Sequence, residues 1–143
     1  MTVLRFPPDF PPTDRWGKLF IGVRWLGPDL SFFKELKNLQ ARRPQTAMAQ
    51  WGGGERQVLA EAIAEVLAIQ LQWKSKVFLP DDAAMAAFHG PSFDFSDPVG
   101  AFDAVVELVG RDFGIQVSAA FWQSHGDSLM GALVDALLRS RDV

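Results

Sequence analysis

The segment from Glu55 to Trp73 constrains the fold most, because its apolar residues recur at the spacing of one helix face. The apolar stripe consists of Leu59, Ile63, Val66 and Leu67, and the polar side of Glu61, Glu65 and Gln72. Such a helix needs other elements to cover its stripe. With five Trp, twelve Phe and 48% hydrophobic residues among 143, the chain can supply that core. We expect one domain, or one domain with an N-terminal arm.

Three further segments predict main helices, at about residues 29–43, 98–113 and 127–141. We expect burial of Phe102, Val105, Val106, Val109 and Phe113 in the second of these, and of Leu129, Leu133 and Leu137 in the last. Asp97 is the expected N-cap of the second, and Gly114 its left-handed C-terminal residue. Residues 81–91 predict about two further helical turns.

Short strands are expected at residues 17–27, where apolar and polar residues alternate, at 76–80 and at 115–117. The predicted fold class is therefore α+β and predominantly helical, with about four main helices in a small bundle and two or three short strands. Residues 1–50 would form an N-terminal Pro-rich arm, strand and helix, and residues 55–143 a helical domain. Residues 44–54 are the expected linker, because the three consecutive glycines Gly52–Gly54 favour a turn or a flexible joint.

The composition excludes several chemistries. The chain contains no Cys, which excludes disulfides, thiolate metal sites and Cys nucleophiles, and no Tyr. It shows neither an apolar signal region nor an apolar run long enough to span a bilayer. Its acidic residues lack the spacing of a calcium loop, and "WGGG" lacks the Lys of a phosphate-binding loop. We therefore expect a cytoplasmic protein with no cofactor and no metal.

The charges are distributed unevenly along the chain. Residues 1–43 contain eight Lys/Arg and four acids, whereas residues 77–135 contain nine acids and one base, Arg111. A surface of one sign raises the encounter rate with a partner of the opposite sign, so a basic protein is the expected partner and nucleic acid is disfavoured. The predicted partner-binding residues are Asp81, Asp82, Asp94, Asp97, Asp103 and Glu107. The alternative is ordinary solubilising charge, with the basic and acidic parts facing each other.

The stretch His125–Leu129 reads "HGDSL", and "GDSL" names a class of serine esterases. Catalysis by Ser128 would require a base, an acid that orients it, and oxyanion donors. In those esterases the motif lies near the N-terminus and the His and Asp lie near the C-terminus, whereas here Ser128 is fifteen residues from the last residue. We expect Asp127 and Ser128 to cap the last helix instead.

From Glu55 to Leu138 the chain resembles acyl carrier proteins. The resemblance is carried by "QVLAEAIAEVLAIQL" (57–71), "LPDD" (79–82), "DAVVELVGRDFGIQV" (103–117) and "SLMGALVDALL" (128–138). It implies a carrier-like helical domain whose acidic helix recognises partners. The phosphopantetheine serine of that family does not carry over, because its place reads Ser96-Asp97-Pro98-Val99. The resemblance thus implies a carrier-like domain without its attachment point.

These observations favour a non-enzymatic small protein that acts by protein–protein binding through an acidic surface, as bacterial immunity and adaptor proteins do. The alternatives are an acyl-carrier-like domain, modified on Ser96 or Ser128, and a serine esterase that uses the GDSL stretch. Trp51 and Trp122 are candidates for exposed anchors of the interface. The oligomeric state is not predicted.

Overall fold

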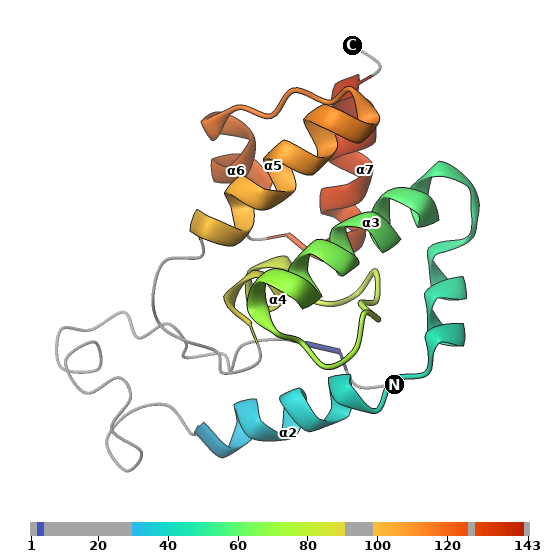
Figure 1. The fold of residues 1–143 in the computed structure, drawn as a ribbon, viewed down its shortest axis with the longest axis vertical. Coiled ribbons are helices and arrows are strands. Elements are labelled where there is room, and N and C mark those ends of the chain that lie inside the picture. The colour runs from blue at the N-terminus through green and yellow to red at the C-terminus, as the bar shows by residue number, and fades with distance from the viewer. Residues whose placement is uncertain (1–2, 5–29, 91–98, 126–127, 142–143) are drawn as a thin grey trace, which may run out of the picture.

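The computed structural model describes residues 3–4, 30–90, 99–125 and 128–141 (Figure 1). Within these ranges the chain forms six α-helices and one 3₁₀ helix. They are α2 (Leu30–Ala41), η1 (Gln45–Trp51), α3 (Gly54–Leu71), α4 (Ala84–His89), α5 (Val99–Phe113), α6 (Ala119–His125) and α7 (Met130–Arg141). No described helix is long and apolar enough to cross a membrane.

The predicted α+β class is wrong for the described part of the chain, which is helical and contains no sheet. Residues 76–80 and 115–117, both predicted as strands, lie outside the helices and form no ladder. The one β-type contact between described residues is an isolated bridge from Ala83 to Leu129. The strand predicted at 17–27 lies outside the described residues.

The physical reason lies in the hydrogen bonds of the 77–79 segment. The carbonyl of Phe78 accepts from the Trp51 indole, and the carbonyl of Val77 accepts from the side chains of Gln40 and Arg43. The Leu79 amide donates to the carboxylate of Asp82. Side chains thus satisfy the backbone groups that a neighbouring strand would otherwise pair.

The helix α3 is central and packs against α5, α7, η1 and α4. In Figure 1, α3 and α5 run side by side, with α5 near the top of the view and α2 at the bottom. One hydrophobic cluster fills the space between the elements. Its members include Leu4, Leu36, Met48 and Trp51, together with Leu59, Ile63 and Leu67 of α3, Val105 and Val109 of α5, and Leu133 and Leu137 of α7.

The four main helices and the short helix α4 are present, with differences at their ends. The last helix begins at Met130 rather than at 127, so Leu129, predicted to be buried, lies outside it and is exposed. Gly114 has the expected left-handed backbone, with φ of 66°. The expected cap at Asp97 lies outside the described residues.

Two helices were not predicted. Residues 45–51, expected to be a linker, form η1, and the turn that follows uses three left-handed glycines with φ of 87°, 77° and 65°. The helix α6 begins after Ser118, whose hydroxyl accepts a hydrogen bond from the Phe121 amide. Ser118 is therefore a typical N-cap residue, and a Ser before a helix can be recognised in the sequence.

Candidate functional site

The six predicted partner-binding residues do not lie together on one surface. Asp103 and Glu107 are exposed one turn apart on α5, and Asp81 is exposed in the loop before α4. Asp94 and Asp97 lie outside the described residues. Asp82 is fully buried, so its place in the predicted surface is a wrong prediction.

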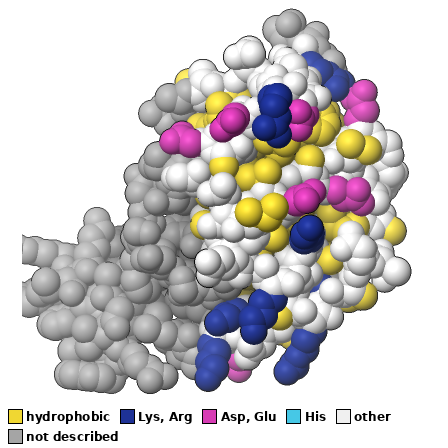
Figure 2. Space-filling model, in the orientation of Figure 1, with side chains coloured by type: hydrophobic (Ala, Val, Ile, Leu, Met, Phe, Trp, Pro, Cys, Tyr) yellow, Lys and Arg dark blue, Asp and Glu magenta, His cyan; other side chains and the backbone are white. Residues whose placement is uncertain are grey.

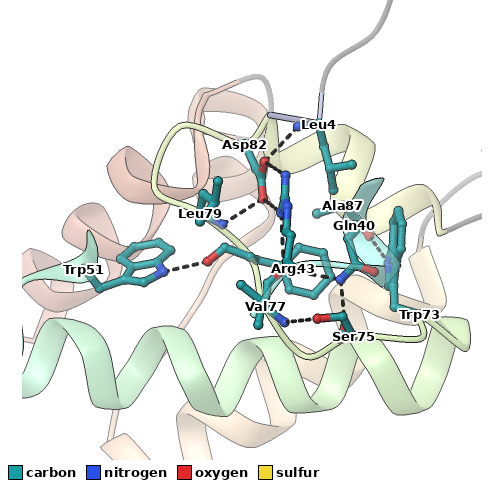
Figure 3. A network of polar contacts seen from close by, with 11 residues as sticks. Leu4, Gln40, Arg43, Trp51, Trp73, Ser75, Val77, Leu79, Asp82 and Ala87 are labelled. Carbon is teal, nitrogen blue, oxygen red and sulfur yellow. Dashed lines mark hydrogen bonds and ion pairs between the residues drawn. The ribbon is translucent and has the colours of Figure 1, made fainter. Parts of the chain in front are cut away.

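Asp82 is buried because its carboxylate receives four hydrogen bonds inside the protein (Figure 3). Its Oδ1 accepts from the amide of Leu4 at 2.8 Å and from Arg43 Nη2 at 2.9 Å. Its Oδ2 accepts from Arg43 Nη1 and from the amide of Leu79, both at 2.7 Å. A buried carboxylate is tolerated only when it is paired in this way. Asp82 therefore has a structural role.

The same polar network fastens the 75–82 segment to the elements around it (Figure 3). Gln40 Nε2 donates to the carbonyls of Ser75 and Val77, and the Trp51 indole N–H donates to the carbonyl of Phe78 at 2.7 Å. Trp51 is therefore a core residue, and its proposed role as an exposed anchor is wrong. The network joins α2 and η1 to the 75–82 segment, and its polar groups do not form a reactive site at the surface.

A different surface shows the features of a binding site. One side of α3 carries an apolar stripe of Val58, Ala62, Val66 and Ile69, spaced by four, four and three residues. Ala62 and Val66, the latter predicted to be a core residue, are half-buried against the core. Val58 is 56% exposed and Ile69 is 65% exposed. Because α3 already buries Leu59, Ile63 and Leu67 on its other side, it is apolar on two faces, and the outer one is exposed at Val58 and Ile69.

Of this stripe, Val66 reaches the space between α3 and α5. A hollow of about 170 Å³ lies where the two helices meet. It is lined by Val66 and Gln70 of α3 and by Ala104, Glu107, Leu108 and Arg111 of α5. The α3–α5 groove is defined as this hollow together with the apolar stripe. Half of the residues that line the hollow are polar or charged, and the exposed apolar surface comes from Val58 and Ile69.

Carboxylates border the α3–α5 groove on both sides. Figure 2 shows hydrophobic side chains between one group of acidic residues over α5 and a second over α3. Asp103 and Glu107 form no ion pair with a described residue. On α3, Glu61 accepts from Gln57, and Glu65 lies 3.6 Å from Lys76. These four carboxylates, Glu61, Glu65, Asp103 and Glu107, are called the acidic rim below.

The one base that lines the hollow is already paired. Arg111 Nε donates to Asp112 Oδ1 at 2.9 Å. This hydrogen bond lowers the pKa of the Asp112 carboxyl and raises the pKa of the Arg111 guanidinium above its ordinary value. Because Arg111 pairs with Asp112 and Lys76 pairs with Glu65, the net charge around the hollow comes from the other three carboxylates of the acidic rim, Glu61, Asp103 and Glu107.

The GDSL stretch is not arranged as an esterase site. The hydroxyl of Ser128 donates to the backbone carbonyl of His125, and the imidazole of His125 packs on Phe121 with ring centroids 4.7 Å apart. The Ser128 hydroxyl was expected to cap α7, but it does not. The carbonyls of Asp82 and Pro80 accept from the first amides of that helix, those of Met130 and Gly131. Asp127 lies outside the described residues.

Other candidate sites gain no support. No three His, Cys, Asp or Glu side chains of the described ranges come close enough to hold a metal ion. Ser96, the serine nearest the carrier-protein attachment position, lies outside those ranges. Trp122 is half-buried against Phe88 and Phe102, with ring centroids 5.9 and 4.5 Å away. Such packing is that of a core residue.

Comparison with known proteins identifies no relative: no family model matches the chain, and no curated protein or solved structure is significantly similar to it. The α3–α5 groove is therefore assessed on its own chemistry. The sequence prediction identified two of its residues, Asp103 and Glu107. It placed Val66 in the buried stripe and missed the exposed apolar positions Val58 and Ile69, although their spacing is visible in the sequence.

Proposed function

We propose that this protein acts without catalysis, by binding a partner protein that presents a basic amphipathic helix to the α3–α5 groove. The observation that carries the proposal is the exposed apolar stripe of α3 between two groups of carboxylates. Amphipathic helices bind such grooves through apolar anchors spaced by three or four residues. We place this activity in the cytoplasm, in a protein of the immunity or adaptor type.

The dimensions of the groove set the length of the partner. From Val58 to Ile69 the stripe covers about 16 Å at 1.5 Å per residue, which is about three helical turns. Aliphatic side chains of the partner would cover Val58, Val66 and Ile69, and flanking Lys or Arg side chains would reach the acidic rim. The buried apolar contact supplies affinity, and the charges supply orientation and a fast encounter.

The test uses a synthetic helix with Leu at positions spaced by four, four and three residues and Lys on both flanks. Binding is measured by fluorescence anisotropy at low and at high salt. We expect saturable binding that weakens with salt, because exposed charges are screened. A scrambled peptide of the same composition, with its Leu residues dispersed around the helix, is the control for charge alone.

Variants locate the site. Glu107→Lys should weaken binding at least about tenfold, since it replaces attraction by repulsion, and Ile69→Ser should weaken it without changing the salt dependence. Asp81→Lys changes the net charge by the same amount as Glu107→Lys. It affects an exposed acid that does not line the groove, so it should bind as the wild type does. Equal loss in Glu107→Lys and Asp81→Lys, or equal binding of both peptides, would reject the proposal.

A further inference from the structure

A second charged surface lies on α2. Its exposed side carries Lys34 and Asn38, with Arg42 directly after the helix and Lys37 on one flank. The exposed acid Glu35 and Leu39, 39% exposed, lie on the other flank, so this surface has three bases and one acid. None of the three bases forms an ion pair with a described carboxylate. The helix α2 therefore presents a basic face with an aliphatic side chain beside it.

This basic face and the α3–α5 groove lie at opposite ends of the same view. Lys and Arg side chains gather at the bottom of Figure 2, over α2, together with an acidic side chain, whereas most acidic side chains lie over α3 and α5. Figure 1 shows α2 and α5 at the two ends of the molecule, with α3 and α4 between them. Since α2 packs into the core through Leu36 and Gln40, it cannot reach the α5 side of its own molecule.

We propose that α2 of one copy of this chain binds the α3–α5 groove of a second copy. This inference rests on the proposed function, because α2 offers the chemistry for which the groove is built: basic side chains beside an aliphatic one. Lys34, Lys37 and Arg42 would lie against the acidic rim, and Leu39 would contact the apolar stripe. Partner binding and self-association then use the same groove and exclude each other.

The geometry predicts a head-to-tail contact. The two surfaces that meet are different, so each contact leaves one α2 and one groove unused, and further copies can add. The charges involved are exposed and therefore screened by salt, so the association should be weak and confined to high protein concentration. The groove would then be covered by α2 of another copy at high protein concentration and exposed again on dilution.

Sedimentation velocity over a concentration series tests this at low and at high salt. We expect the average mass to rise above that of a single chain at low salt and to return to it at high salt. The double variant Lys34→Glu/Arg42→Glu and the groove variant Asp103→Lys/Glu107→Lys should each associate at least about tenfold more weakly. Lys74→Glu, at an exposed base outside α2, should associate as the wild type does.

Sedimentation of an equal mixture of the two double variants is the decisive measurement. Their charges are complementary, so the equal mixture should associate where each variant alone does not; an unfolded variant could not produce this result. A wild type that stays a single chain at all concentrations, or double variants that associate as it does, would overturn the inference.

The proposed function is tested separately. Lys34→Glu/Arg42→Glu keeps the groove and should still bind the Leu/Lys peptide, and loss of that binding in the wild type would reject the function itself.

Discussion

The guanidinium of Arg43 forms two hydrogen bonds to the carboxylate of Asp82, at 2.7 and 2.9 Å, with both side chains buried. The pair joins residues 39 positions apart. The same carboxylate holds the amide of Leu4, and the carbonyl of Leu4 accepts from the amide of Ala83. The pair is therefore the point at which the N-terminal residues, the end of α2 and the segment before α4 are fastened together.

Replacing Asp82 by Asn should destabilise the protein strongly. Asn keeps the size but removes the charge, which leaves the guanidinium of Arg43 buried without a counter-charge. Breaking a buried pair on one side costs about 3–5 kcal/mol. Urea unfolding measures the loss. The control is Asp81→Asn at the exposed neighbour, expected within about 0.5 kcal/mol of the wild type. Equal stability of the two variants would contradict the structural role of Asp82.

Replacing Gly131 by Ala should destabilise the protein, although Ala is ordinarily the better helix residue. A Cβ at Gly131 would lie 2.8 Å from Arg56 Nη2 and 3.1 Å from the carbonyl oxygen of Pro80. Arg56 would have to move away from Asp135, with which it pairs at 2.9 Å, and from the ring of Trp51. We expect a cost of about 1–3 kcal/mol in thermal unfolding.

Gly110→Ala is the matched control for Gly131→Ala. Gly110 lies inside α5, and a Cβ there would meet only the carbonyl oxygen of Ile115, at an ordinary distance of 3.7 Å. This variant should gain up to about 1 kcal/mol from helix propensity. If both variants shifted stability in the same direction, the close approach at Gly131 would not be the cause.

Replacing Arg111 by Gln should return the pKa of Asp112 to its ordinary value. The hydrogen bond from Arg111 lowers that pKa in the folded protein. The pair's contribution to stability is therefore complete above the unfolded pKa of Asp112 and is lost as the pH falls through the lowered folded value. Because both groups are exposed, the stability effect is small, and an NMR titration of the Asp112 carboxyl is the measurement.

The same variant bears on the groove. Arg111→Gln removes a positive charge from its lining, so the affinity for the Leu/Lys peptide should rise about threefold at low salt and be unchanged at high salt. An unshifted Asp112 pKa would disprove the pairing of Arg111 with Asp112. A fall in affinity would show instead that Arg111 contacts the partner.

The sequence predicts the main helices because their signals are local. The spacing of Leu59, Ile63 and Leu67 predicts α3, and Gly114 predicts the end of α5, without reference to the rest of the chain. The strand predicted at 76–80 failed because its backbone groups are satisfied by the side chains of Gln40, Arg43 and Trp51. Partners 27 to 37 residues away leave no trace in a local pattern.

The acidic surface was predictable only in part, because burial of an acid also depends on partners that are distant in the sequence. Asp81 and Asp82 are adjacent and chemically identical in the sequence, yet one is exposed and the other lies in the core. The partners of Asp82, which are Arg43 and the amides of Leu4 and Leu79, distinguish them. The exposed positions Val58 and Ile69, by contrast, follow from the helical spacing once the buried stripe of α3 is fixed. These exposed apolar positions could therefore have been predicted from the sequence.

The extended segment before α4 also has a consequence for the order of folding. The helices close contacts within a few residues, whereas Asp82 joins residues 39 and 78 positions away, Arg43 and Leu4. Contacts across long loops form late, because the chain entropy of closing the loop is lost before the contact stabilises it. We expect the helices to form first and the Asp82 contacts to close in the rate-limiting step, so the segment without regular structure sets the folding rate of a helical protein.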